Sequence, residues 1–280
     1  MILDGKSLSR KIRKKIKLEI SEHNYVPGLV VLIVGEDKSS NKYVNMKNIA
    51  CKEVGIYSVI HRELENISEK ELLNKIEMLN NNDKIDGILV QLPLPPHINQ
   101  NKILEAISIE KDVDGFHPYN VGCLASGLDS FVPCTPLGVM ELFKEYSIDI
   151  EGKDICMIGS SNIVGKPMAN LLINNKATVT ICNKNTLDLK KHTLNSDIII
   201  VAAGVINLIT KDMVQKDAII IDIGINILDD GSLVGDVDFK NLKEKVSMIT
   251  PVPGGVGPMT ISMLLSNTLK AYKKRRNIKE

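Results

Sequence analysis

Tyr43 and Lys47 both carry titratable side chains and are four positions apart in the first half of the chain. In a helix predicted over 39–54, this spacing places them on one face, one turn apart. An ordinary lysine has a pKa of about 10.4 and is protonated at neutral pH. Burial lowers that pKa toward the range useful for acid–base catalysis. The alternative interpretation is a surface Tyr–Lys pair without a function.

Gln91 lies in the otherwise apolar run 87–92, which stops at Pro93, Pro95 and Pro96. A buried amide needs hydrogen-bond partners, and one at the carboxyl end of a strand is placed to face a ligand. Two carboxylates, Asp112 and Asp114, follow in the turn 111–115. They are candidates for binding, or they cap a helix or turn.

The second half contains a strand–turn–helix pattern. The apolar run 155–158 breaks at Gly159, Ser160 and Ser161 follow, and helical spacing begins near Pro167. Exposed backbone N–H groups and the positive end of a helix can hold a phosphate in such a unit. The spacing differs from Gly-x-Gly-x-x-Gly, and one strand ending in glycine is ordinary in α/β proteins. The pattern indicates a nucleotide cofactor in this half.

The strand predicted next, 178–182, ends where a NAD-type site places an acidic residue against the ribose hydroxyls. This chain has Lys184 there. A lysine attracts a 2′-phosphate, which favours NADP over NAD, and the alternative is a solvated loop lysine. Two further predicted strands run into glycines, Gly204 and Gly224, at the sheet edge where open parallel sheets bind ligands. Three such ends in succession predict a dinucleotide site.

Alternating strands and helices must position these residues. Apolar runs predict strands at 29–34, 87–92, 154–158, 178–182, 197–202, 218–223 and 246–249. Helical periodicity predicts helices at 8–22, 39–54, 69–80, 138–146, 167–173 and 259–274. Continuous apolar strands are typical of parallel sheets covered on both faces, so the predicted class is α/β.

A chain of 280 residues is long for a single core and favours two domains. Glycine, serine and proline are frequent around 120–136, and the helix after the loop 251–258 can pack back on the first domain. The prediction is a catalytic domain of 1–135 plus 258–280 and a cofactor domain of 136–257. Both are α/β, the second a Rossmann-like doubly wound parallel sheet, with a cleft between them.

Composition limits the possible partners. A hydrophobic share of 44%, a charged share of 25% and a net charge of +1 give no reason to expect nucleic acid or membrane. No segment approaches the roughly 20 apolar residues of a membrane helix, and no signal-peptide core is visible, so the expected location is cytoplasmic. The five cysteines lack a Cys-x-x-Cys pair and the histidines lack ligand spacing, which favours reduced thiols and no metal site.

The chain resembles the bifunctional methylenetetrahydrofolate dehydrogenase/cyclohydrolases over nearly its whole length. The motifs that carry the resemblance, in the family's order, are Tyr43-x-x-x-Lys47 and the segments 86–95, 111–115, 133–136, 159–167 and 251–260. The resemblance implies oxidation of methylenetetrahydrofolate with NADP to methenyltetrahydrofolate, and hydrolysis of that product to 10-formyltetrahydrofolate. It also implies a homodimer formed through the cofactor domains.

The resemblance implies a role for each matching residue. Lys47 is expected to be the principal catalytic side chain and Gln91 to hold and tune it. Tyr43 is expected to stack on the folate ring, and Asp114 to bind the pterin's donor edge. The substrate-binding set is completed by Val90, Leu92, Pro253, Gly254, Gly255 and Gly257, and the expected dinucleotide contacts are Gly159, Ser160, Ser161, Lys184 and Ile225. Many members have arginine where this chain has Ser160, which leaves Lys184 to meet the 2′-phosphate.

Three other functions stay open. One is a dehydrogenase without cyclohydrolase activity, one a catalytically silent nucleotide-binding regulator, and one a shikimate-type or amino-acid dehydrogenase. The retained Tyr43, Lys47 and Gln91 argue against the first two. The third shares the two-domain plan but does not explain the glutamine strand or the glycine-rich loop before the last helix.

Overall fold

The computed structural model describes residues 1–36 and 38–278. Lys279 and Glu280, which end the predicted catalytic domain, lie outside the described residues. The chain divides into two compact units. The Lys47 unit consists of Arg10–Cys123, Asp129–Cys134 and Ile261–Glu280, and the Gly159 unit consists of Met1–Ser9, Leu124–Leu128 and Thr135–Thr260.

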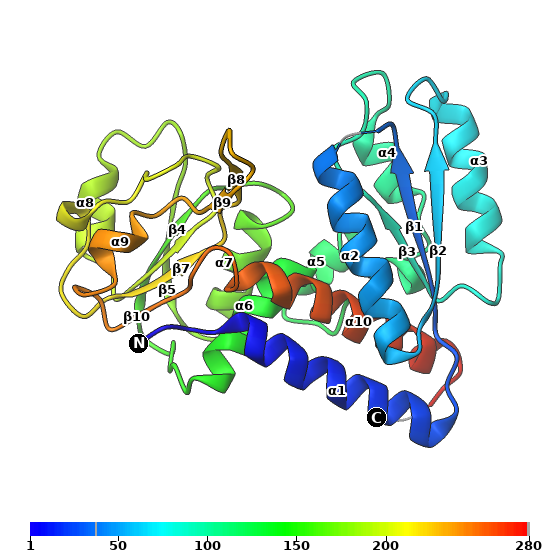
Figure 1. The fold of residues 1–280 in the computed structure, drawn as a ribbon, viewed down its shortest axis with the longest axis horizontal. Helices are drawn as coiled ribbons and strands as arrows, with labels where there is room; N and C mark the ends of the chain where they lie inside the picture. The colour runs from blue at the N-terminus through cyan, green and yellow to red at the C-terminus, as the bar shows by residue number, and fades with distance from the viewer. Residues whose placement is uncertain (37, 279–280) are drawn as a thin grey trace. The chain divides into compact units, whose positions relative to one another are not determined.

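Helices and strands alternate along the chain (Figure 1). The α-helices are α1 (Gly5–His23), α2 (Lys38–Val54), α3 (Glu69–Asn80), α4 (Gln100–Glu105), α5 (Pro118–Ala125), α6 (Cys134–Glu145), α7 (Gly165–Asn174), α8 (Leu189–Leu194), α9 (Phe239–Leu242) and α10 (Val256–Arg275), and the 3₁₀ turns are η1 (Ile109–Lys111) and η2 (Lys211–Met213). The strands are β1 (Gly28–Val34), β2 (Tyr57–Glu63), β3 (Gly87–Val90), β4 (Asp154–Ile158), β5 (Thr178–Cys182), β6 (Ile198–Val201), β7 (Ile219–Asp222), β8 (Asn226–Ile227), β9 (Leu233–Val234) and β10 (Met248–Ile249). Within the described ranges, no helix is both long and apolar enough to cross a membrane.

The Lys47 unit is built on a parallel sheet with strand order β2-β1-β3. All seven residues of β1 are buried, as expected for a central strand covered on both faces. Figure 1 shows α2 and α3 on opposite faces of this sheet. Side chains of β1 and β3 on one face pack with those of α3 and α4, for example Leu32 with Leu72 and Ile103 in one buried cluster.

Helix α3 shows why these segments become helices. Ser68 caps its first turn and Glu71 completes the capping box, so two backbone N–H groups at this end are bonded. Leu72, Ile76 and Leu79 recur at spacings of four and three, which gives one buried stripe. Capping and periodicity therefore agree on the position and orientation of this helix.

The Gly159 unit contains a parallel sheet with strand order β10-β7-β6-β4-β5. From β4 the chain moves to β5 on one side and then to β6 on the other, so the order reverses at β4. This is the topological switch point of a doubly wound sheet, where ligands bind beyond the carboxyl ends of the strands. In Figure 1, α8 and α9 lie on one side of the sheet and α7 on the other. The α/β class and the Rossmann-like parallel sheet are confirmed.

The sequence prediction lacks β2 and several short helices. Strand β2 is an edge strand whose side chains are mostly half-buried, so it has no continuous apolar run. Helices α4, α5, α8 and α9 have at most eight residues, too few to establish a period. Helices α6 and α10 begin earlier than predicted because Pro136 and Pro258 stand in their first turns, where a missing N–H costs no hydrogen bond.

Candidate active site and cofactor site

Lys47 and Gln91 meet in the Lys47 unit although they are 44 positions apart in the sequence. Lys47 is on α2, and its Nζ donates a hydrogen bond of 3.0 Å to Oε1 of Gln91. Gln91 follows β3, one residue beyond Val90, and its backbone N–H donates to the carbonyl of Leu32 at 2.8 Å. Its Nε2 donates to the carbonyl of Leu92 at 2.9 Å. The amide is therefore held in one orientation, with its oxygen toward the lysine.

The surroundings of Lys47 favour its neutral form. Burial lowers its pKa, and the negative charge of Asp114 acts in the opposite direction with a smaller effect. Two cysteines also lie close, but burial raises the pKa of Cys51 to about 12 and that of Cys134 well above its ordinary value. Both thiols are therefore uncharged at neutral pH, and Asp114 is the nearby group that limits the decrease in the pKa of Lys47.

The structure separates the two carboxylates of the turn 111–115. Asp112 is 1% exposed and accepts hydrogen bonds from the backbone N–H groups of Phe116 and His117 and from Asn120 Nδ2. It is a structural cap at the start of α5, the alternative interpretation of the sequence. Asp114 keeps part of its surface exposed and lies close enough to Lys47 for each charge to affect the other's pKa. Burial raises the pKa of Asp114.

Two further residues support Asp114 and are missing from the sequence prediction. Cys134 is 2% exposed, and its Sγ lies 3.5 Å from the carbonyl of Val113 and forms a hydrogen bond with the Asp114 side chain. Asn267 on α10 is 3% exposed and donates through Nδ2 to the carbonyls of Val113 and Val132, at 2.8 and 3.0 Å. Asn267 shares a helix face with the buried Met263, Leu264 and Ala271. An amide on such an apolar face was the available signal, because a buried amide needs partners.

The other residues predicted to bind substrate in the Lys47 unit lie around the same two elements. Tyr43 is half-buried on α2, one turn before Lys47, and burial raises its pKa. Val90 is buried at the end of β3, and Leu92 follows Gln91 with part of its surface exposed. The side chain of Val90 packs in the buried cluster with α3 and α4, so it points away from Lys47. The site therefore combines an aromatic ring, an amine and a carboxylate.

In the Gly159 unit, the turn after β4 has the close approaches of a dinucleotide-binding turn. Gly159 has φ of +115°, and a Cβ there would collide with the carbonyl of Ala202 after β6. A Cβ on Gly165 would collide with the carbonyl of Gly159, so the first turn of α7 packs directly against the end of β4. These are the tight-turn and helix–strand packing functions of glycines in dinucleotide sites.

The N-terminus of α7 follows this turn. Ser161 Oγ accepts from the backbone N–H groups of Val164 and Gly165, at 3.2 and 3.4 Å, and Ser160 and Ser161 both retain exposed surface. The N–H groups at the start of this helix are bonded within the turn, because that of Lys166 donates to the carbonyl of Ser161 at 3.0 Å. The positive end of the helix dipole and the hydroxyl groups of Ser160 and Ser161 are therefore what this turn offers to an anion. These residues fit the phosphates of a dinucleotide.

Lys184 lies in an exposed turn at the same sheet edge. Strands β4 and β5 pair with Ile158 opposite Cys182, so Gly159 and Lys184 follow the ends of adjacent strands. The turn is closed by a hydrogen bond of 2.9 Å from the N–H of Thr186 to the carbonyl of Asn183. The position of Lys184 matches that of the residue that recognises the ribose 2′ substituent in dinucleotide-binding domains.

The loop before α10 belongs to the Gly159 unit. Gly254 has φ of +110°, and the N–H of Gly255 donates to the carbonyl of Pro251 at 2.8 Å. A Cβ on Gly257 would lie 4.0 Å from Cδ1 of Ile225, a residue that is 42% exposed. The structure thus brings Gly257, predicted to bind substrate, near Ile225, predicted to bind the dinucleotide. Pro253 precedes these glycines in the same loop.

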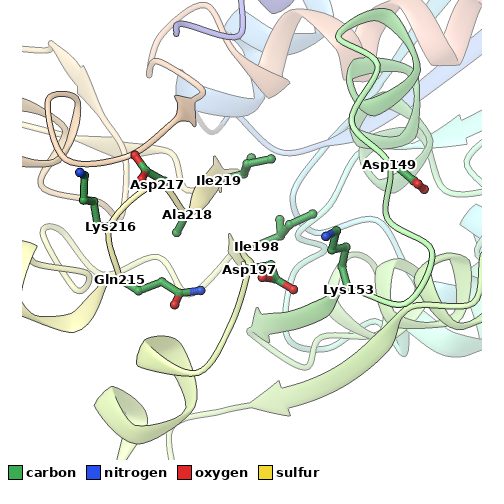
Figure 2. A pocket seen from close by; sticks show the side chains of 9 residues that line it. All are labelled: Asp149, Lys153, Asp197, Ile198, Gln215, Lys216, Asp217, Ala218 and Ile219. Carbon is green, nitrogen blue, oxygen red and sulfur yellow. The ribbon is translucent and has the colours of Figure 1, made fainter.

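A pocket of about 370 Å³ lies elsewhere in the Gly159 unit (Figure 2). Its lining residues are at or just before the first residues of β4, β6 and β7, with Lys153, Asp197 and Asp217 among them. Cofactors of doubly wound sheets bind beyond the carboxyl ends of the strands, so this pocket is at the opposite edge from Gly159. Over 1–36 and 38–278, no group of three or more His, Cys, Asp or Glu side chains could hold a metal ion.

Comparison with known proteins identifies the two parts. Residues 3–114 match the catalytic domain of tetrahydrofolate dehydrogenase/cyclohydrolase, and residues 133–276 match its NAD(P)-binding domain. The chain is 62% identical over 278 residues to "Bifunctional protein FolD" of Sulfurovum sp. (strain NBC37-1), covering 98% of this chain and 99% of that protein.

Two solved structures are similar over nearly the full length. The FolD methylenetetrahydrofolate dehydrogenase/cyclohydrolase from Campylobacter jejuni has a TM-score of 0.96 and 53% identity, over 98% of this chain and 99% of that one. The Trypanosoma brucei enzyme, complexed with NADP cofactor and inhibitor, has a TM-score of 0.95 and 36% identity, over 99% of this chain and 98% of that one.

These matches decide between the functions that the sequence left open. The paired catalytic and NAD(P)-binding domains exclude a shikimate-type assignment. The chain belongs to the tetrahydrofolate dehydrogenase/cyclohydrolase family, and it is a bifunctional enzyme that oxidises 5,10-methylenetetrahydrofolate with NADP and hydrolyses the methenyl product to 10-formyltetrahydrofolate.

Proposed function

We propose that Lys47 is the acid–base residue of the hydrolysis and that Gln91 positions it. The 3.0 Å hydrogen bond between them and the lowered pKa of the buried amine support these roles. Hydrolysis requires water to be activated and protons to be moved, which an amine does well when its pKa approaches the working pH. A neutral partner holds the amine without stabilising its charged form as strongly as a carboxylate does.

We assign folate binding to residues around this pair. Tyr43 stacks on the ring system, Asp114 accepts hydrogen bonds from the pterin's donor edge, and Leu92 and the backbone of Val90 supply further contacts. The part of Asp114 that stays exposed supports its role, because a ligand can reach it. The backbone of Pro253, Gly254, Gly255 and Gly257 contributes further substrate contacts.

We assign the dinucleotide to Gly159, Ser160, Ser161, Lys184 and Ile225. NADP, when bound, accepts the hydride from the one-carbon unit of the substrate. The protein's part in this step is mainly positioning, since the two nitrogens that flank the carbon already delocalise the developing cation. The close approaches at Gly159 and Gly165 support this site, because side chains there would fill the space where the turn packs.

We further propose domain limits and an assembly. The catalytic domain comprises 1–135 plus 258–280, and the NADP domain comprises 136–257. Two copies associate through their cofactor domains, with β5 as the contact strand. In the described part of the sheet, β5 is an edge strand next to β4, and its Ile181 is 44% exposed. Light scattering should give twice the chain mass of 30.9 kDa, and a mass of one chain at micromolar concentration contradicts this assembly.

We place the enzyme in the cytoplasm. All five cysteines are buried free thiols, and Cys156 donates a hydrogen bond to the sulfur of Cys182 at 3.7 Å without forming a disulfide. Such thiols are typical of a reducing compartment.

One assay tests the assignment of both activities. Purified protein is incubated with methylenetetrahydrofolate and NADP, and in a separate reaction with NAD, while absorbance follows the methenyl product. We expect the methenyl signal to rise faster with NADP and then to decay. Methenyltetrahydrofolate supplied without a dinucleotide tests hydrolysis by itself. A missing methenyl signal with both dinucleotides contradicts the dehydrogenase assignment.

Exchanging Lys184 for aspartate should reverse part of the cofactor preference. A charge-assisted bond from lysine to the 2′-phosphate is lost and a like charge takes its place, so the ratio of kcat/KM for NADP to that for NAD should fall about tenfold, or about 1.4 kcal/mol. Lys240→Asp is the control, because Lys240 is an exposed lysine on α9. An unchanged ratio in Lys184→Asp contradicts the assignment of Lys184.

A further inference from the structure

Two buried carboxylates in the Gly159 unit have no role in the function described so far. Asp222 ends β7 and is 3% exposed, and Asp236 follows β9 and is 0% exposed. Burying a carboxylate costs free energy unless hydrogen bonds satisfy it. The hydrogen-bond partners of the two carboxylates therefore show which segments they hold in place.

Asp236 accepts four hydrogen bonds from neutral donors. Its Oδ2 accepts from the backbone N–H groups of Ala203 and Gly204 at 2.7 and 2.9 Å, and its Oδ1 accepts from the N–H of Val205 and from Asn226 Nδ2, both at 2.9 Å. Three consecutive N–H groups therefore converge on one carboxylate, as they do on bound anions in backbone nests. The bonds fix the segment after β6 and tie it to the start of β8.

Asp222 holds the backbone that carries Asp236. Its Oδ1 accepts from the N–H groups of Gly224 and Asp236 at 3.0 and 3.1 Å, and its Oδ2 accepts from that of Val237 at 3.1 Å. A Cβ on Gly224 would collide with the carboxylate of Asp236, and one on Gly235 with that of Asp222. The two glycines let the chain approach both carboxylates closely.

The pair fixes the residues on both sides of Ile225. Gly224 is bonded to Asp222, Asn226 is bonded to Asp236, and Ile225 between them keeps 42% of its surface exposed. The segment 203–205 begins after Ala202, whose carbonyl lies against Gly159. In a doubly wound sheet, the strands beyond the switch point serve the second mononucleotide half, which in NADP carries the nicotinamide.

We propose that Asp236 is a positioning residue for the nicotinamide half of NADP. It does not touch the ligand, since it has no exposed surface, but holds 203–205 and Asn226 in the conformation to which that half binds. The inference rests on the proposed placement of the dinucleotide at Gly159 and Ile225. Asp222 supports Asp236 by fixing its backbone.

The decisive variant is Asp236→Asn, which keeps the shape but turns an amide NH₂ toward N–H donors. We expect the Kd for NADP to rise at least about tenfold, or about 1.4 kcal/mol. The inhibition constant of adenosine 2′,5′-bisphosphate, which carries only the adenine half, should change less than twofold. Hydrolysis of methenyltetrahydrofolate without a dinucleotide should stay within twofold of wild type and reports correct folding.

Two further variants complete the design. Asp238→Asn is the matched control, because Asp238 caps α9 and asparagine is an equally good cap. Asn226→Ala removes one of the four donors to Asp236 and should raise the Kd for NADP about threefold, so the proposal can be tested even if Asp236→Asn does not fold.

Each outcome distinguishes one explanation from another. An unchanged Kd for NADP in Asp236→Asn and Asn226→Ala overturns the proposal while wild-type dehydrogenase activity still supports the assigned function. Equal weakening of NADP, the bisphosphate and hydrolysis indicates general destabilisation and also overturns it. Wild-type protein that does not oxidise methylenetetrahydrofolate with NADP contradicts the assigned function instead.

Discussion

Replacing Lys47 with methionine is expected to reduce the hydrolysis of methenyltetrahydrofolate about a thousandfold. The reason is that positioned acid–base groups contribute about 10²- to 10⁴-fold to such rates, and methionine keeps the length of the side chain without a proton to move. Stopped-flow mixing of methenyltetrahydrofolate with the variant, without a dinucleotide, measures the hydrolysis rate directly. Lys52→Met is the matched control, since Lys52 is an exposed lysine on the same helix. Hydrolysis at the wild-type rate in Lys47→Met contradicts the acid–base role of Lys47.

The pH dependence of the same reaction gives an independent test. Because burial lowers the pKa of Lys47, the neutral amine becomes populated at a pH below the ordinary 10.5. If the neutral amine acts as the base, the rate should rise as pH increases through this lowered pKa. The inflection should be lost in Lys47→Met and retained in Lys52→Met. An inflection that persists in Lys47→Met belongs to another group.

Replacing Asp114 with alanine is expected to raise the KM for methylenetetrahydrofolate by about 10- to 100-fold. The pterin's donors then lack their acceptor, and each tenfold corresponds to about 1.4 kcal/mol, within the range for a hydrogen bond to a charged group. Initial rates of NADP reduction over a range of folate concentrations measure the effect. Glu110→Ala, which removes an exposed carboxylate from η1, should leave KM unchanged. Steady-state kinetics of Asp114→Ala equal to those of wild type refute the assignment.

The raised pKa of Asp114 predicts how the KM for folate depends on pH. Its carboxylate accepts hydrogen bonds best when ionised, and burial moves its protonation to a higher pH than that of an ordinary aspartate. The KM for folate should therefore increase as pH falls through that raised pKa. Asp114→Ala should show a high KM without this increase, because the titrating group is gone.

Sequence patterns predicted the structure where the pattern lies within one helix or one strand–turn–helix unit. The turn at Gly159 and the i to i+4 spacing of Tyr43 and Lys47 each lie within one strand–turn–helix unit or one helix, and the structure shows them there. The strand predicted over 87–92 is also present, but it ends at Val90, two residues before the predicted end. Local patterns also predict the α/β class, since continuous apolar strands require cover on both faces. The order of motifs supported the family assignment, which the comparisons then confirmed.

Tertiary structure alone decided which of these residues meet. Lys47 and Gln91 are joined across 44 positions by the pairing of β1 and β3, which no spacing in the sequence records. It also separated Asp112, which accepts hydrogen bonds from three donors at 116–120, from Asp114, whose charge interacts with that of Lys47. The roles of Asn267 and Asp236 were not predicted from the sequence because those roles depend on their hydrogen-bond partners. Such partners come from distant segments, and only packing brings those segments within bonding distance.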